Sequence, residues 1–194
     1  TEQQDKRVAF IYNTIGYLKD ELEKRGSTLL VLYGNPVEVF RLLLEKYNIV
    51  SVYANHDYEP YSLNRDKSVG ELLKDKGVAF RTFKDQVIFE KSEVVKSDGS
   101  PYTVFTPYSR AWKAALQSSP LIEFASELFL GSLFKTEHST LPDIREIGFV
   151  QCDTLAVNPL IREDVIIHYH MTRDLPSVEG TSNLGIYLRF GRLS

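Results

Sequence analysis

The sequence predicts an α/β fold built on an open parallel sheet. Three observations carry this prediction: helical and strand-like segments alternate through the first 120 of the 194 residues, the loops between them are short, and the strand-like segments are continuously apolar. Continuous apolar runs are typical of strands buried on both faces. Repeated strand–helix–strand order implies parallel strands with right-handed crossovers. We therefore expect a Rossmann-like sheet covered by helices.

The first predicted helix is amphipathic, and Gly26 follows it at the position where glycine ends helices. Its apolar face consists of Val8, Ile11, Ile15, Leu18 and Leu22. The short apolar run Thr28–Tyr33 predicts the first strand. Asn35 and Pro36 then form a typical helix start, an N-cap residue followed by proline at the first helical position.

The same pattern continues to about residue 120. Strands are predicted over Val50–Ala54 and Val78–Arg81, and the helix between them, Pro60–Lys76, closes at Gly77. Beyond these, Asp98-Gly99 predicts a hairpin turn among short strands. Those strands would cover 86–89, 93–96 and 102–105, and a last helix would begin at Thr106-Pro107.

A change of composition predicts three parts: an α/β domain over 1–120, a connector over 121–160, and the start of a helical domain over 161–194. The connector has two basic and six acidic residues and several turn signals, among them Leu141-Pro142 and Asn158-Pro159. At most short helices are expected in it.

Composition excludes several classes of protein. The net charge of −3 argues against a generally basic nucleic-acid binder, and no apolar run reaches the roughly 18 residues of a membrane span. Cys152 is the only cysteine, so an intrachain disulfide and a cysteine-based zinc site are impossible, and a reducing, cytoplasmic location is expected. The chain starts at Thr1 without Met and stops inside a segment that looks helical, so we expect an internal piece of a longer protein.

Open parallel sheets bind ligands beyond the carboxyl ends of their strands. Here those ends are followed by 34–35, 55–59 and 84–86, and none is a Gly-rich phosphate loop of the GxGxxG or Walker A type. For 55–59, a polar loop that caps the next helix is favoured over a ligand role.

Several segments carry a resemblance to a known family. They are YANHDYEPY (53–61), NRD (64–66), TFKDQVIF (82–89), YTVFTPY (102–108), Tyr169, RDLP (173–176), EGTSNLG (179–185) and LRFG (188–191). In this order they resemble the photolyase/cryptochrome family, and most of all the bacterial enzymes that repair cyclobutane pyrimidine dimers. Residues 1–120 would be a truncated antenna-binding domain, and 161–194 the start of an FAD-binding domain.

The resemblance implies a light-driven DNA repair flavoenzyme, a deoxyribodipyrimidine photo-lyase. Reduced FAD would donate an electron to a dimer in UV-damaged DNA, and a second antenna chromophore, a folate or a deazaflavin or flavin, would collect light. The parent would be a monomer without a membrane segment. The chain alone would be inactive, because it keeps one rim of the flavin site and none of its other walls.

Residue types alone make Thr181 or Ser182 a plain helix N-cap, although hydroxyls at such a junction also suit a pyrophosphate. The resemblance favours the second interpretation. It implies that FAD is contacted by Tyr169, Thr181, Ser182, Asn183, Leu184 and Gly185. Gly185 stands where the family has serine, so one hydroxyl contact is lost.

Arg173 has two interpretations that the sequence leaves open. The resemblance implies a contact with the DNA backbone, which a planar guanidinium suits. The alternative is a structural ion pair with Asp174 or Glu179.

Other candidates are set aside. His168 and His170 lack the partners of a metal site, and Trp112 at helical spacing from Tyr108 is expected in the core. Two alternative functions remain: a cryptochrome-type photoreceptor without repair activity, and a free-standing nucleotide-binding module. The 169–184 segment argues against the second, which would need no flavin seat.

Overall fold

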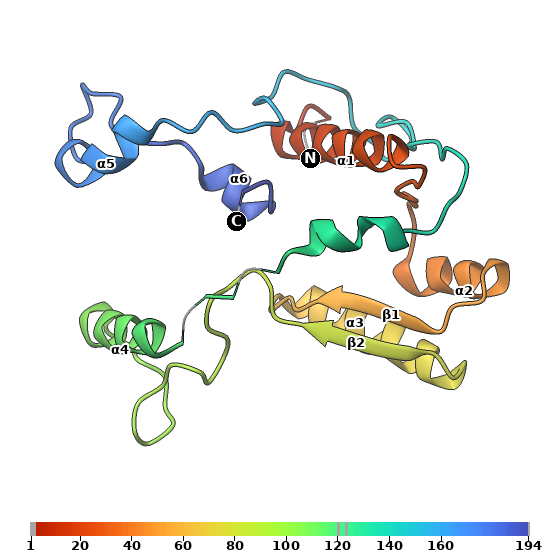
Figure 1. Ribbon diagram of the computed structural model, residues 1–194, viewed down its shortest axis with the longest axis horizontal. Helices are drawn as coiled ribbons and strands as arrows, with labels where there is room; N and C mark the ends of the chain where they lie inside the picture. The colour runs from red at the N-terminus through yellow and green to blue at the C-terminus, as the bar shows by residue number, and fades with distance from the viewer. Residues whose placement is uncertain (1–2, 120, 123, 194) are drawn as a thin grey trace. The chain divides into compact units, whose positions relative to one another are not determined.

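The computed structural model describes residues 3–119, 121–122 and 124–193. It divides into two compact units, Gly34–Gly131 and a second made of Thr1–Tyr33 with Ser132–Ser194 (Figure 1). The units do not follow the predicted domains, because residues 132–157 and the helix near the C-terminus pack with the first helix. The boundaries 1–120, 121–160 and 161–194 stay a prediction.

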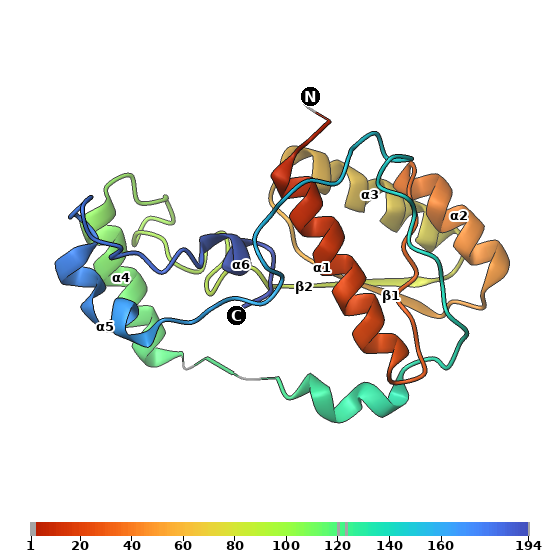
Figure 2. The ribbon, with the colours of Figure 1, turned by 90° about the horizontal axis from the view of Figure 1, so that it is seen from above.

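The unit Gly34–Gly131 contains the parallel sheet that the sequence predicts. Strand β1 (Ser51–Asn55) pairs in parallel with β2 (Ala79–Phe83), in register from Ser51 opposite Ala79 to Asn55 opposite Phe83. Helix α3 (Pro60–Asp75) makes the crossover and buries Val69 and Leu73. Figure 2 shows α3 and α2 (Pro36–Lys46) on the same side of the sheet.

Three of the predicted helix signals are confirmed in detail: one helix start and two glycines that follow helices. Asn35 Oδ1 accepts a hydrogen bond of 3.0 Å from the Val37 amide, with Pro36 as the first residue of α2. Gly77 has a φ of +71°, the left-handed conformation that lets a chain leave a helix, and Gly26 has one of +73°.

The predicted strand Thr28–Tyr33 is wrong. The segment makes no ladder in the described residues, and the exposed fractions of Leu32 and Tyr33 are 48% and 70%. Its hydrogen bonds go to the connector instead: Ser27 Oγ donates to the Phe134 carbonyl at 2.8 Å, and Ser139 Oγ donates to the Leu29 carbonyl at 2.9 Å. An apolar run becomes a buried strand only where neighbouring strands pair with it, and in the described residues the sheet contains β1 and β2 alone.

The strands predicted around Asp98-Gly99 are also absent from the described residues. The turn itself is present, because Gly99 has a φ of +79° and Lys96 N donates to the Ser100 carbonyl at 2.9 Å. The segments 86–89, 93–96 and 102–105 form turns and irregular backbone, except that Phe105 begins helix α4 (Phe105–Ser118). Trp112 of α4 is half-buried, with its ring edge-on to Phe89 at 5.7 Å between centroids.

The second unit is organised around helix α1 (Lys6–Glu23), which Asp5 caps. At its C-terminal end, Glu23 accepts hydrogen bonds from Lys19 and Thr28, and its other oxygen lies 2.8 Å from His138 Nδ1. Hydrogen bonding from Lys19, then from His138, lowers the pKa of Glu23 to about 2. These contacts fasten the connector to the end of α1.

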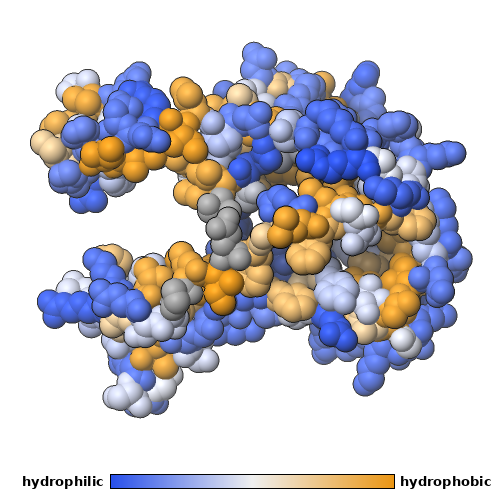
Figure 3. Space-filling view, in the orientation of Figure 1, coloured by the Kyte–Doolittle hydropathy of each residue, from blue (hydrophilic) through white to orange (hydrophobic). Residues whose placement is uncertain are grey.

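The remaining elements are short. They are the 3-10 helix η1 (Ser126–Ser132), α5 (Glu163–Thr172) and α6 (Gly185–Arg189). Few side chains are fully buried, and Figure 3 shows hydrophobic residues reaching the surface among hydrophilic ones. No helix in the described part of the chain is long and apolar enough to cross a bilayer.

Candidate functional site

The residues proposed from sequence to contact FAD and DNA lie on α5, on α6 and on the segment that joins them. Tyr169 is on α5 and has an exposed fraction of 44%. Arg173 caps the C-terminal end of α5, and its guanidinium lies 5.8 Å from the centre of the Tyr169 ring. The structure therefore brings these two together, at a distance that allows a cation–π contact.

The structure also reports on the ion pair predicted for Arg173. Its Nε lies 3.3 Å from Asp174 Oδ2, whereas Glu179 pairs with Arg162 at 3.4 Å. Both side chains of the Arg173–Asp174 pair are largely exposed, so the pair contributes about 1 kcal/mol or less to stability. It orients the arginine without burying it, and a role in binding DNA stays open.

The turn that follows begins at Gly180, which is buried against the end of α5. The single proton of Thr172 Oγ1 is shared between the Gly180 carbonyl at 3.2 Å and the His168 carbonyl at 3.1 Å, and Gly180 N donates to the Val178 carbonyl at 2.7 Å. A Cβ atom at Gly180 would lie 2.5 Å from Thr172 Cβ and 2.7 Å from its carbonyl oxygen. Only glycine fits this close approach.

The polar residues Thr181, Ser182 and Asn183 come next. Thr181 and Asn183 are exposed and Ser182 is half-buried; Thr181 Oγ1 donates weakly to Asn183 Oδ1 at 3.5 Å. Asn183 has a φ of +55°, a left-handed conformation that asparagine tolerates well. Ser182 Oγ makes no hydrogen bond with any part of the chain that the structure describes.

The helix cap expected at Thr181 or Ser182 lies elsewhere. The N-cap of α6 is Leu184, which offers no side-chain hydrogen bond, and Gly185 is the first helical residue. Leu184 is buried, and a Cβ at Gly185 would meet nothing within 4 Å. The hydroxyls of Thr181 and Ser182 are therefore not used to cap the helix.

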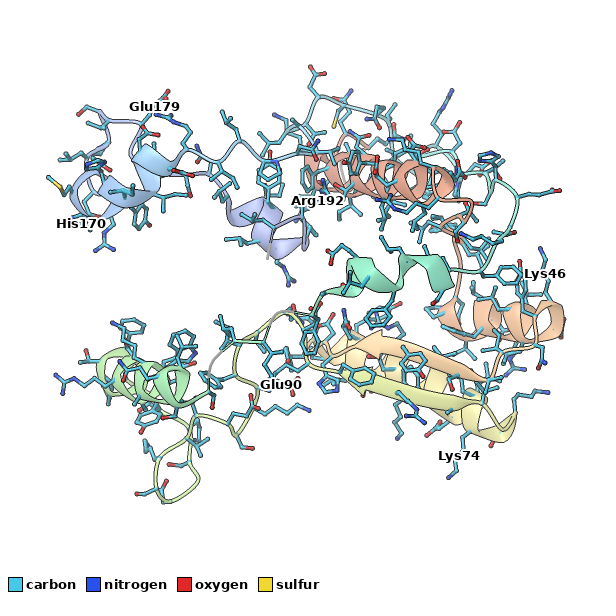
Figure 4. All side chains as sticks on the ribbon, viewed as in Figure 1. Lys46, Lys74, Glu90, His170, Glu179 and Arg192 are labelled. Carbon is cyan, nitrogen blue, oxygen red and sulfur yellow. The ribbon has the colours of Figure 1, made fainter. Side chains whose placement is uncertain are left out.

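A second polar cluster lies at the carboxyl ends of β1 and β2, where Figure 4 labels Glu90. His56 Nδ1 lies 2.5 Å from Glu90 Oε1 and its Nε2 lies 3.0 Å from Thr82 Oγ1. Tyr58 OH donates to the same Glu90 oxygen, and Asn55 Nδ2 donates to Asp85 Oδ2 at 2.8 Å. Desolvation, followed by the bond to Glu90, raises the pKa of Tyr58 to about 12.

Asp57 completes this cluster and precedes α3, whose N-cap residue is Glu59. Its carboxylate accepts hydrogen bonds from the Tyr58 and Glu59 amides and from Ser62 Oγ. The bond from the Glu59 amide, then that from Ser62, holds the pKa of Asp57 below its ordinary value. These bonds hold the loop 55–59 together and tie it to Ser62 of α3. The side-chain cap that the sequence favoured is not made, because the N-cap residue Glu59 offers no side-chain hydrogen bond.

His168 and His170, which the sequence analysis set aside as metal ligands, do not belong to a metal-binding cluster among the described residues. His168 Nδ1 lies 2.8 Å from the Asp164 carbonyl oxygen. Across the described ranges, no group of three or more His, Cys, Asp or Glu side chains is placed to hold a metal ion.

Sequence reasoning missed three residues that support the candidate segment: Phe10, Thr172 and Tyr187. Phe10 and Tyr187 pack beside Leu184, and Thr172 supports Gly180. The apolar spacing in α1 predicted a different face: the helix buries Ala9 and Phe10, whereas Leu18 of the predicted face is 46% exposed. Nothing in the sequence pairs Thr172 with Gly180, eight residues on.

Solved structures show the class of fold. A bacterial class III photolyase from Agrobacterium tumefaciens matches the whole chain with a TM-score of 0.69 at 21% identity, over 43% of its own length. An archaeal photolyase from Sulfolobus tokodaii, solved with two FAD molecules, matches with a TM-score of 0.58 at 20% identity. At this identity the likeness shows the fold alone: the α/β fold of photolyases.

Sequence comparison shows the family. The DNA photolyase family model matches residues 1–126, and the chain belongs to this family. A deoxyribodipyrimidine photo-lyase of Halobacterium salinarum is 30% identical over 96% of this chain and 41% of its own length. A more distant relative is cryptochrome-2 of Arabidopsis thaliana, 24% identical over 93% of this chain. The chain thus spans about two fifths of the photo-lyase relative.

Proposed function

We propose that the whole protein carrying this chain is a light-driven deoxyribodipyrimidine photo-lyase, which splits cyclobutane pyrimidine dimers in UV-damaged DNA. Membership of the DNA photolyase family carries this proposal, together with relatives that bear the photo-lyase name. Within it, residues 1–120 would form the antenna-binding domain, 121–160 the connector and 161–194 the start of the FAD-binding domain.

The residues of the candidate segment suit a flavin pyrophosphate. Thr181, Ser182 and Asn183 supply two hydroxyls and a side-chain amide in succession, and these groups are exposed or half-exposed. The tight contact of Gly180 with Thr172 fixes the start of the turn. Hydroxyl and amide donors bind phosphate oxygens through strong charge-assisted hydrogen bonds.

Tyr169, Leu184 and Gly185 would complete the contacts of this chain with FAD. Leu184 and Gly185 offer backbone, and Tyr169 offers a half-exposed ring. When bound, reduced FAD supplies the electron that splits the dimer. The chain's own residues hold the cofactor and orient it.

Arg173 would bind the DNA backbone. Its side chain is 53% exposed, and Asp174 engages only Nε, so the rest of the fork makes no hydrogen bond with the described residues. A fork held at one nitrogen and open at the others suits a phosphate.

A second, light-harvesting chromophore would belong to residues 1–120. The archaeal neighbour, with its two FAD molecules, supports such a cofactor, and its chemical identity in this protein is left unassigned. The likeness to cryptochrome-2 keeps a photoreceptor without repair as the second candidate. Illumination of dimer-containing DNA with the whole protein distinguishes the two, since only the first restores intact pyrimidines.

Two variants of the whole protein test the residue assignments. Ser182→Ala removes a donor to a charged phosphate, which costs about 1.5–3 kcal/mol, so the FAD content after purification should fall. Arg173→Ala should keep the FAD content, weaken binding to dimer-containing DNA, and reduce the salt dependence by about one phosphate contact.

The opposite pattern would overturn the assignments. If Arg173→Ala lost FAD while its affinity for DNA per flavin-loaded molecule stayed the same, Arg173 would shape the 174–180 loop instead. If Ser182→Ala kept its full FAD content, the flavin seat would be wrong.

A further inference from the structure

Helix α6, which follows the candidate flavin segment, is held by α1 at the other end of the sequence. Phe10, Leu184 and Tyr187 form a hydrophobic cluster of buried residues. Phe10 has no exposed surface, and its ring lies edge-on to Tyr187, with 5.6 Å between centroids. The Phe10 ring also lies 5.9 Å from that of Phe190.

Polar contacts hold the same region from its other side. Tyr187 OH donates to the Ala156 carbonyl at 3.0 Å. Arg192, which Figure 4 labels beside α6, lies 4.7 Å over the Tyr17 ring of α1, and its Nη2 donates to Asn158 Oδ1 at 2.6 Å. Residues after α6 are thus tied both to α1 and to the connector.

Helix α6 is too short to be stable by itself. It has five residues, and isolated helices shorter than about 12–15 residues are marginal in water. Its stability must therefore come from packing, and Phe10 is the residue of α1 at the centre of that packing. Leu184 connects this cluster to the polar turn, because it is both a cluster member and the cap of α6.

The turn Thr181–Asn183 is consequently held at two points. Thr172 fixes its start through Gly180, and the buried cluster of Phe10, Tyr187 and Leu184 fixes its end. The three polar residues between these points have few contacts of their own, so the two anchors decide where their side chains point.

We propose that Phe10 is a positioning residue for the flavin pyrophosphate: through the buried cluster that it forms with Tyr187 and Leu184, it sets the geometry of the turn Thr181–Asn183. This inference rests on the proposed function. Phe10 does not touch the cofactor in this arrangement. It acts through this cluster, and α1 thereby couples the family's α/β domain to the start of its flavin segment.

Two variants with matched burial test this role in the whole protein. Phe10→Leu shrinks the aromatic anchor. Leu73→Ala is the control, because Leu73 is likewise without exposed surface but lies on α3 in the other compact unit. The rate of FAD release is measured well below both melting temperatures, so that global unfolding does not contribute.

The expected result separates the two variants. Phe10→Leu should release FAD about tenfold faster, the effect of weakening one hydrogen bond to a charged group, while Leu73→Ala stays within about twofold of the parent. In the flavin-free protein, Phe10→Leu should also speed hydrogen exchange at the Leu188 and Phe190 amides, which donate within α6. If Phe10 had only a structural role, Phe10→Leu would lower the melting temperature, but its FAD release rate relative to the parent would equal that of Leu73→Ala.

The double variant Phe10→Leu/Ser182→Ala gives a third readout. If Phe10 works through the turn, the two effects on FAD release should be less than additive. Equal FAD release in Phe10→Leu and Leu73→Ala, beside a lowered FAD content in Ser182→Ala, would overturn the positioning role and leave the proposed function intact. An unchanged FAD content in Ser182→Ala would contradict the flavin seat, and the positioning role with it.

Discussion

The segment after β1 and the turn before α6 are both rich in polar side chains, but the fold uses their hydrogen bonds differently. At the strand ends, both nitrogens of His56 have partners, and Asp57 accepts three hydrogen bonds. In the turn, Ser182 has no hydrogen-bond partner in the described residues, and Thr181 has a weak contact of 3.5 Å. Polar residues at a loop therefore do not by themselves indicate a site; what matters is whether the fold already uses their hydrogen bonds.

The largest effect on the geometry of the turn and on FAD retention is expected at Gly180, where the turn is most crowded. Gly180→Ala would place a Cβ atom 2.5 Å from Thr172 Cβ and 2.7 Å from its backbone oxygen, so the backbone must move. Overpacking of this kind costs about 1–3 kcal/mol. The Gly180 amide, which donates to Val178, should lose its protection from hydrogen exchange, and the whole protein should retain less FAD.

Gly185→Ala is the matched control for this change, because a Cβ there meets nothing within 4 Å. Both variants change glycine to alanine within the same segment. Equal exchange rates in the two variants would show that the Gly180 contact does not shape the turn.

A smaller effect is expected from removing one hydroxyl at each place. Tyr58→Phe takes away the donor to Glu90 and should lower the free energy of unfolding measured in urea titrations. Ser182→Ala should leave that free energy nearly unchanged, since its hydroxyl has no internal partner in the described residues. Tyr61→Phe, at a tyrosine that is 69% exposed, controls for the aromatic substitution. If Ser182→Ala lowered the free energy of unfolding as much as Tyr58→Phe, the turn and the strand-end cluster would not differ in how the fold uses their hydroxyls.

Acid should weaken the strand-end cluster in a predictable direction. Hydrogen bonds from the Glu59 amide, then from Ser62 and the Tyr58 amide, hold the pKa of Asp57 below its ordinary 3.8. A lowered pKa in the folded state contributes stability that is fully present above the ordinary value and is lost as the pH falls below it. Asp57→Asn should therefore make the free energy of unfolding fall less steeply below about pH 4. Urea unfolding at successive pH values measures this dependence. Asp75→Asn, at an exposed position in the last turn of α3, controls for the loss of one negative charge.

The sequence predicted the helices of the α/β part and the strands β1 and β2, where local signals were strong, but not the other strands. Asn35-Pro36 and Gly77 mark helix ends through the conformations they favour, and β1 and β2 begin within one residue of the prediction. Thr28–Tyr33 failed because burial on two faces depends on neighbours that the segment itself does not encode.

The candidate site likewise has a part that the sequence predicted and a part that it did not. Its residues could be chosen from sequence, because the motif 179–185 resembles that of the family. Its supports could not, because Phe10 lies 174 positions before Leu184 and nothing in α1 indicates which part of the chain covers it.

The smallest expected effect concerns Gly185, where the family has serine. Both serine and alanine fit, and both favour a helix over glycine, by about 0.5 kcal/mol for serine and up to about 1 kcal/mol for alanine. Hydrogen exchange within α6 should therefore slow most in Gly185→Ala and less in Gly185→Ser. If the added hydroxyl binds flavin phosphate, FAD retention in the whole protein should follow the reverse order, with serine above alanine. Retention in the order alanine, serine, glycine would mean that helix stability alone controls the flavin, and that residue 185 contributes only its backbone.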